Sequence, residues 1–106
     1  LEEGDIVEFG NSFVEVIFVP GHSPGHIAFV NHDEKFIING DVLFKGSFGR
    51  YDLPGGNIYV LSHSIQTKLF CLADDYIVYA GHMGETTIGA EKLTNPILEF
   101  PTVEPK

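Results

Sequence analysis

Alternating apolar and polar positions in the first part of the chain predict two β-hairpins. Residues 5–9 and 13–19 are rich in Val, Ile and Phe, and the turn sequence Gly10-Asn11 separates them, as is typical of a tight hairpin. A second apolar pair, residues 27–31 and 36–38, is joined by a short charged tip. We therefore expect four successive strands in this part of the chain.

Helical spacing of apolar residues first appears after Asn57, which is a favourable N-cap residue. The spacing predicts a helix that runs to about Leu72, with the apolar positions Ile58, Leu61, Ile65, Leu69 and Leu72 on one face. A buried strand is expected over residues 76–80. A second helix is expected from a cap at Thr86 or Thr87 through Leu93.

The stretch between the hairpins and the first helix, residues 45–57, is rich in glycine and polar residues. We predict a long loop here, and its aromatic residues and single arginine favour an ordered one. Loops of this length are usually functional when they are ordered.

Composition limits the class of protein. The chain has 106 residues, of which 43% are hydrophobic and 12% aromatic, which is enough for one small domain with a packed core. The net charge of −9 argues against binding of nucleic acid or anionic membranes, both of which require a basic surface. With Cys71 as the single cysteine, no internal disulfide forms, which fits a reducing, cytoplasmic location.

Candidate chemistry lies at the ends of the predicted strands. His22, Asp41 and His82 each follow a glycine after an apolar segment. Two imidazoles and a carboxylate are ligands for zinc or iron, and a carboxylate can bridge two cations, as two-metal hydrolases require. From the residues alone, turn positions with surface histidines remain an open alternative, and His32 in the charged tip is expected to be merely solvated.

Several motifs together resemble the metallo-β-lactamase superfamily. They are the segments 20–26 (PGHSPGH), 39–44 (NGDVLF) and 80–82 (AGH). The loop sequence at 46–56 and the Thr94-Asn95-Pro96 segment narrow the resemblance to glyoxalase II-like hydrolases of the short bacterial type.

The resemblance implies an α+β fold, an αββα sandwich in which two mixed sheets face each other with helices outside. The family's His-x-His-x-Asp-His segment should precede residue 1, so we expect the chain to be the C-terminal half of the domain (1–100) with a tail (101–106). Alone, it is expected to be inactive, to bind metal weakly or not at all, and to self-associate. Self-association would use an uncovered apolar surface around Phe13, Val14, Val16, Phe18, Phe29 and Ile38.

The resemblance also assigns roles within the site. His22 would bind the first metal, His82 the second, and Asp41 would bridge both as the catalytic carboxylate, while His26 would support the ligands without binding metal. Two divalent ions are implied, with zinc expected first and iron or manganese as alternatives. The implied reaction is hydrolysis of a small-molecule thioester such as S-lactoylglutathione by a metal-bound hydroxide.

The substrate loop departs from the family pattern. The resemblance assigns substrate binding to Arg50 and Tyr51. Arg50 stands where glutathione-specific enzymes have Lys, and Asp52 stands where they have Tyr, so Arg50 either pairs with a substrate carboxylate or forms a salt bridge with Asp52.

Two rival functions remain open. A persulfide dioxygenase with a single iron shares a Gly-Arg-x-Asp loop like residues 49–52, although Pro54-Gly55-Gly56 favours the hydrolase. The other rival is a non-catalytic acidic interaction module whose histidines are incidental.

Overall fold

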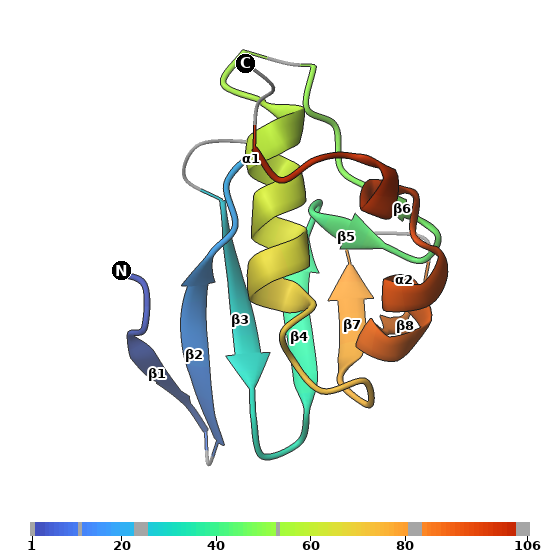
Figure 1. Ribbon diagram of the computed structural model, residues 1–106. Coiled ribbons are helices and arrows are strands. Elements are labelled where there is room, and N and C mark those ends of the chain that lie inside the picture. The colour runs from blue at the N-terminus through green and yellow to red at the C-terminus, as the bar shows by residue number, and fades with distance from the viewer. Residues whose placement is uncertain (1, 11, 23–25, 53, 81–83, 104–106) are drawn as a thin grey trace.

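A six-stranded β-sheet forms the centre of the computed structural model, which describes residues 2–10, 12–22, 26–52, 54–80 and 84–103 (Figure 1). The strand order is β1-β2-β3-β4-β7-β8. All neighbouring strands are antiparallel except β4 and β7, which are parallel. The strands are β1 (Ile6–Phe9), β2 (Ser12–Phe18), β3 (Ile27–Asn31), β4 (Phe36–Gly40), β7 (Ile77–Ala80) and β8 (Thr86–Thr87).

Both predicted hairpins are confirmed, as β1–β2 and β3–β4. The parallel pairing of β4 with β7 joins segments about forty positions apart in the sequence, and it pairs Gly40 with Ala80 at the carboxyl ends of the two strands. Loops that leave the carboxyl ends of neighbouring parallel strands emerge at one edge of the sheet. The end of β7 at Ala80 therefore lies next to the end of β4, which Asp41 follows directly.

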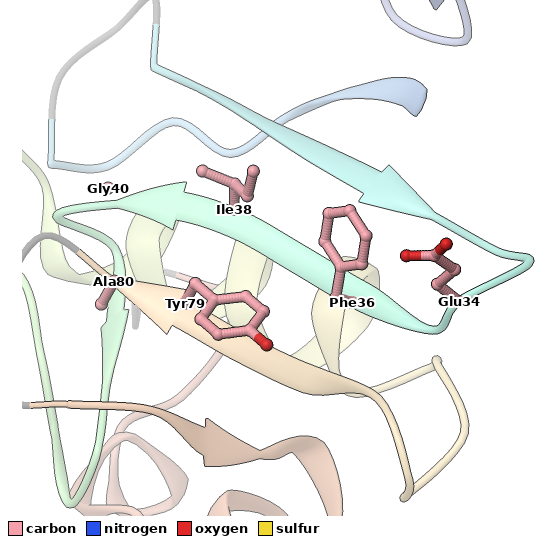
Figure 2. Close-up of a pocket in the computed structure, with 6 residues that line it drawn as sticks. All are labelled: Glu34, Phe36, Ile38, Gly40, Tyr79 and Ala80. Carbon is pink, nitrogen blue, oxygen red and sulfur yellow. The ribbon is translucent and has the colours of Figure 1, made fainter. Parts of the chain in front are cut away.

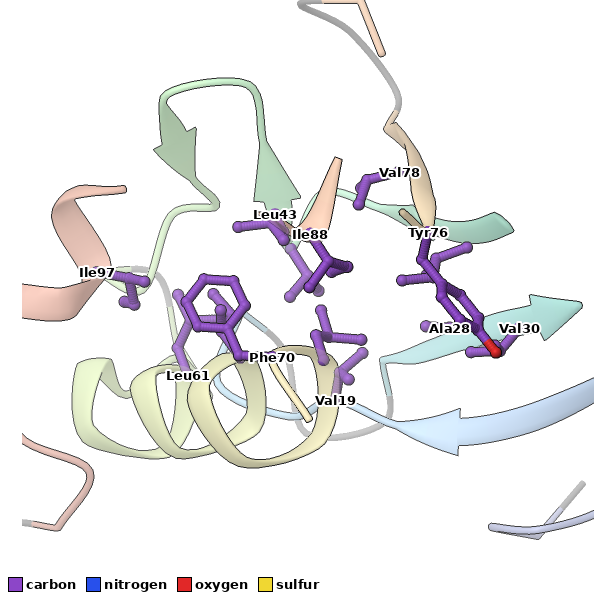
Figure 3. Packing of buried hydrophobic residues seen from close by; sticks show 14 residues of the cluster. Val19, Ala28, Val30, Leu43, Leu61, Phe70, Tyr76, Val78, Ile88 and Ile97 are labelled. Atoms are coloured by element: carbon purple, nitrogen blue, oxygen red, sulfur yellow. The ribbon is translucent and has the colours of Figure 1, made fainter. Parts of the chain in front are cut away.

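One long helical segment covers one face of the sheet (Figures 1 and 3). It begins as α1 (Ile58–His63) and continues as a π-helical turn, η1 (Ser64–Leu69). The Asn57 side chain caps it, because its Oδ1 accepts hydrogen bonds from the backbone N–H groups of Tyr59 and Val60. The predicted helix is confirmed, but it ends at Leu69 rather than Leu72. No helix among the described residues is long and apolar enough to span a bilayer.

The hydrophobic core lies between this helical segment and the sheet (Figure 3). Each fully buried aliphatic side chain contributes about 1.5–3 kcal/mol through removal of apolar surface from water. The fully buried residues of the core come from both the sheet and the helical segment, with further members from the loops and α2. They include Val19, Ala28, Val30, Ile37, Leu43, Leu61, Ile65, Leu69, Val78, Ile88 and Ile97.

The C-terminal part forms α2 (Ile88–Thr94), which is capped by Thr87 and lies next to β8, and the short 3-10 helix η2 (Pro96–Glu99), which lies next to η1. The predicted loop at 45–57 is wrong in its first part, because Ser47–Phe48 (β6) pairs with Leu43–Phe44 (β5) in a small hairpin. Strands of two residues are too short to show any periodicity.

No helix of the described residues covers the opposite face of the sheet (Figure 1). Cross-strand pairing places Val16, Phe29, Ile38 and Tyr79 in one row on this face. Ile38 and Tyr79 are 48% and 42% exposed, and Figure 2 shows both on a surface hollow of about 500 Å³ with Phe36. A second hollow of about 370 Å³ is lined by Val7, Val14, Phe29, Phe36 and Ile38.

The predicted apolar surface is therefore present among the described residues, but two of its expected members differ. Val16 lies on this face yet is fully buried. Phe13 is 55% exposed but lies on the other face, because residues alternate along β2. Self-association through this face stays a prediction.

Candidate metal site

His22 is positioned by direct packing of its turn on the helical segment. Gly21 adopts a φ of +125°, and a Cβ at this position would lie 2.3 Å from the backbone of Leu61. The Gly21 carbonyl also accepts a hydrogen bond from the N–H of Asn57 at 2.8 Å. Only glycine fits here, so the start of α1 fixes the position of the His22 turn.

The His22 ring is oriented by the backbone of the loop that carries Arg50. Its Nδ1 lies 2.8 Å from the carbonyl oxygen of Arg50. A carbonyl oxygen only accepts hydrogen bonds, so Nδ1 carries the hydrogen and Nε2 of the neutral ring keeps a lone pair. A histidine whose Nδ1–H is held by a carbonyl is the usual arrangement of a metal ligand that binds through Nε2.

Asp41 follows β4 and lies in the same cavity as His22. This cavity of about 160 Å³ is lined by His22, Asp41, Phe44, Gly49 and Arg50. A Cβ on Gly49 would lie 1.7 Å from the Asp41 carbonyl oxygen and 3.4 Å from His22 Nδ1. Gly49 therefore lets the loop that orients His22 pack directly against the turn that carries Asp41.

His26 makes a different kind of contact. Its Nε2 lies 2.7 Å from the carbonyl oxygen of Asn39, so that nitrogen donates a hydrogen bond and offers no lone pair to a metal. The ring packs edge-on against His22, with centroids 5.7 Å apart. These contacts support the prediction that His26 supports a ligand without being one.

The third predicted ligand, His82, falls at positions 81–83, outside the described residues. Strand β7, which leads toward it, ends at Ala80 opposite Gly40, the residue before Asp41. Within the described ranges, no group of three or more His, Cys, Asp or Glu residues is arranged to hold a metal ion. The structure thus brings His22 and Asp41 together, and convergence with His82 stays a prediction.

The donor types of His22 and Asp41 fit a divalent metal. An imidazole nitrogen and a carboxylate both suit zinc, iron and manganese, so these two residues alone do not select among the three metals. The held Nδ1 of His22 is the feature that favours a ligand over a simple surface histidine.

Gly49 and Arg50 of the loop that follows β6 line this cavity. The Arg50 guanidinium donates two hydrogen bonds to the Asp52 carboxylate, Nε to Oδ1 and Nη2 to Oδ2, each at 3.2 Å. These bonds raise the pKa of Arg50 and lower the pKa of Asp52. Tyr51 stacks on Phe48, with ring centroids 6.4 Å apart, and also packs near Phe100. The salt-bridge alternative for Arg50 is the one that the structure shows.

Two features escaped the sequence analysis. The first is the backbone carbonyl of Arg50, which orients His22. Every residue has such a carbonyl, so the residue type at position 50 does not predict this contact. His32 is not merely solvated, because its ring nitrogens contact the Tyr76 hydroxyl at 2.7 Å and the Glu15 carboxylate at 2.9 Å. Tyr76 is 44 positions away, beyond the reach of any local pattern.

Comparison with known proteins shows the family and the fold of this chain. Residues 1–82 match the family described as the metallo-beta-lactamase superfamily. The chain is 48% identical over 97 residues to the hydroxyacylglutathione hydrolase GloC of Haemophilus influenzae, covering 92% of this chain and 46% of the relative. It matches the C-terminal part of that protein and spans about half the length of the curated relatives.

Three solved structures have the same fold. The BLEG-1 B3 metallo-beta-lactamase has a TM-score of 0.87 at 40% identity, covering 92% of this chain and 47% of its own. TTHA1623 in a di-iron-bound form has a TM-score of 0.82 at 45% identity, covering 91% and 46%. ETHE1 from Myxococcus xanthus has a TM-score of 0.84 at 33% identity, covering 91% and 44%.

These matches confirm the α+β fold and the resemblance to glyoxalase II-like proteins that the motifs indicated. The superfamily match covers residues 1–82 of 106, which takes in both His22 and Asp41. The chain belongs to the metallo-β-lactamase superfamily.

Proposed function

We propose that the full-length protein containing this chain is a metal-dependent hydrolase of a thioester such as S-lactoylglutathione. The observation that carries the proposal is the hydrogen bond between His22 Nδ1 and the Arg50 carbonyl, which leaves Nε2 available beside Asp41 in one cavity. The similarity to a hydroxyacylglutathione hydrolase supports this choice of substrate class.

Each residue has a distinct task in this proposal. His22 and His82 would each hold one divalent ion, and Asp41 would contribute its carboxylate to both. Bound divalent ions supply a nucleophile at neutral pH by lowering the pKa of water, and they polarise the thioester carbonyl. The Arg50 carbonyl keeps His22 in the tautomer that ligation requires. Arg50, which lines the cavity, and Tyr51, which follows Arg50 in the chain and stacks on Phe48, would contact the rest of the substrate.

The test is thioester hydrolysis by the full-length gene product loaded separately with zinc, iron or manganese. Release of free thiol is followed for the unaltered protein and for His22→Ala. His63→Ala is the matched control, because His63 is exposed on α1 and lines a different hollow. We expect turnover that His22→Ala abolishes and His63→Ala retains. Equal turnover in all three proteins would overturn the proposal.

A second candidate is an iron-dependent persulfide dioxygenase. Two observations favour it. The loop sequence Gly49-Arg50-Tyr51-Asp52 contains the hydrogen-bonded Arg50–Asp52 pair, and the chain is structurally similar to ETHE1. The same iron-loaded preparation separates the two functions, since a dioxygenase consumes oxygen with a persulfide and leaves thioesters intact. A preparation that binds no metal and has neither activity would favour the non-catalytic interaction module.

A further inference from the structure

Glu91 is a buried acidic residue outside the cavity of the candidate metal site. It lies in α2 and is 3% exposed. Its Oε1 accepts hydrogen bonds from the backbone N–H of Gly46 at 2.9 Å and from Asn95 Nδ2 at 2.8 Å, and its Oε2 accepts one from Thr86 Oγ1 at 2.6 Å. These donors are uncharged groups on three different segments of the chain. A carboxylate only accepts hydrogen bonds, so Glu91 can satisfy all three donors at once.

Two of these contacts hold the tip of the β5–β6 hairpin. Gly46 lies in the turn between β5 and β6. Asn95, which Glu91 holds, also donates a hydrogen bond from Nδ2 to the carbonyl oxygen of Ser47 at 2.9 Å. The third contact joins Glu91 to Thr86 in β8, which is a strand of the main sheet. Glu91 therefore fastens the hairpin tip to α2 and to the main sheet (Figure 1).

The base of the same hairpin carries parts of the candidate metal site. Asp41 lies two positions before β5, and Gly49 and Arg50 directly follow β6. The N–H of Gly49 donates a hydrogen bond to the carbonyl of Val42 at 2.9 Å, which closes this base. The next carbonyl, that of Arg50, lies 2.8 Å from His22 Nδ1. A shift of the hairpin would therefore change the distance between this carbonyl and the His22 ring.

The strand that leads to Arg50 is weakly held by packing alone. Each strand of the hairpin has two residues, and short two-stranded hairpins are only marginally stable without support from other elements. Leu43 and Phe44 of β5 are buried, whereas Ser47 and Phe48 of β6 are only partly buried. The polar contacts of Glu91 and Asn95 thus reach the hairpin at its tip and at the start of its less buried strand.

We propose that Glu91 is a positioning residue of the candidate metal site. It acts through the hairpin, because a fixed tip keeps the Arg50 carbonyl on His22 Nδ1 and leaves Nε2 available for a metal. The inference rests on the proposed function, since it takes His22 as a metal ligand. Loss of a group that orients a metal-binding histidine weakens metal affinity about 10- to 100-fold. Because Glu91 acts at one remove, we expect a loss of about tenfold.

The test compares Glu91→Ala with Glu91→Gln in the full-length gene product. NMR spectra of the imidazole nitrogens in the metal-free protein, recorded at about pH 8, show which nitrogen of neutral His22 carries the hydrogen. The His22 signals are assigned by their loss in His22→Ala, and calorimetry gives the affinity for zinc. Glu91→Ala should lose the single Nδ1–H form of His22 and bind zinc about tenfold more weakly.

Glu91→Gln should retain the Nδ1–H form of His22 and the zinc affinity. A glutamine side chain can accept hydrogen bonds from Gly46 and Asn95 through its oxygen and donate one to the Thr86 hydroxyl through its amide nitrogen. The anchor of the hairpin would then stay in place without the charge.

Two further variants complete the comparison. Asn31→Ala is the matched control, because Asn31 is 1% exposed and its Oδ1 accepts a hydrogen bond from the N–H of Glu34, in the turn at the other end of β4 from Asp41. It should lower the melting temperature and leave both readouts unchanged. Thr86→Val removes one contact of Glu91 and keeps the side-chain shape. It should change both readouts in the same direction as Glu91→Ala by a smaller amount, and it serves if Glu91→Ala does not fold.

Two results would overturn the inference. One is a folded Glu91→Ala, or Thr86→Val in its place, that keeps the His22 tautomer or the zinc affinity of the unaltered protein. The other is Glu91→Gln or Asn31→Ala with changes as large as those variants show, because charge or general stability would then be responsible. The tautomer is measured without metal or substrate, so it decides the inference even if the full-length protein cleaves no thioester and the proposed function fails. Thioester hydrolysis together with an unchanged tautomer in Glu91→Ala would overturn the inference alone.

Discussion

Gly49→Ala tests whether close packing of two loops builds the candidate metal site. The new Cβ would lie 1.7 Å from the Asp41 carbonyl oxygen and 2.9 Å from its carbonyl carbon, much closer than any side-chain carbon approaches a backbone. The φ of Gly49 is not in the left-handed region, so the backbone itself would accept alanine. The cost is therefore steric, and overpacking of this kind destabilises by about 1–3 kcal/mol.

The clash must separate the Asp41 turn from the loop that orients His22. For a domain of this size, the loss corresponds to a melting temperature lower by roughly 5–20 °C. We also expect weaker metal binding in the full-length gene product, measured by calorimetry with zinc or manganese. Circular dichroism during heating gives the loss of stability.

Gly10→Ala is the control for Gly49→Ala. Gly10 has a φ of +61° with no atom within 4 Å of the added Cβ, so alanine there costs about 1 kcal/mol of backbone strain far from the site. It should lower stability without changing metal affinity. The reasoning is wrong if Gly49→Ala melts like the unaltered protein, or if both variants bind metal equally well.

Two further predictions concern the scaffold around the site. Glu91 is 3% exposed and accepts hydrogen bonds from Gly46 N, Thr86 Oγ1 and Asn95 Nδ2, so Glu91→Ala should lower the free energy of unfolding by about 3–5 kcal/mol in urea titrations, and a loss below 1 kcal/mol would contradict this. Lys68 donates a hydrogen bond to Glu3, and that bond is the main reason the pKa of Glu3 is lowered. Because the folded pKa is the lower one, this contribution to stability is present above the unfolded pKa of about 4.5 and is lost as the pH falls through the folded pKa. Glu3→Gln should therefore flatten the pH dependence of the melting temperature below pH 4.5, and an unchanged profile would refute the assignment.

Local patterns predicted the elements whose causes are local. The Asn57 cap and the apolar residues at helical spacing marked the long helix, and Gly10-Asn11 marked the first hairpin. The sequence did not predict the change to a π-helical turn at Ser64, because the helical spacing of apolar residues continues through this turn to Leu69.

Features that depend on residues far apart in the sequence could not be predicted from local patterns. The parallel pairing of β4 with β7 joins segments about forty positions apart, and no repeat or turn sequence marks it. The motifs predicted His22 and Asp41 as neighbours, which the shared cavity supports. They could not show that the Arg50 carbonyl orients His22 or that Gly49 brings the two loops into contact, because both effects act through the backbone.

We expect His22 and Asp41 to belong to one metal site, with His22 binding through Nε2. The most direct measurement is anomalous diffraction from crystals of the full-length gene product loaded with zinc or manganese. We expect an anomalous peak in bonding contact with His22 Nε2 and an Asp41 carboxylate oxygen, with the hydrogen bond from His22 Nδ1 to the Arg50 carbonyl intact. A metal bound elsewhere, or bound to His22 Nδ1 with that bond broken, would contradict it.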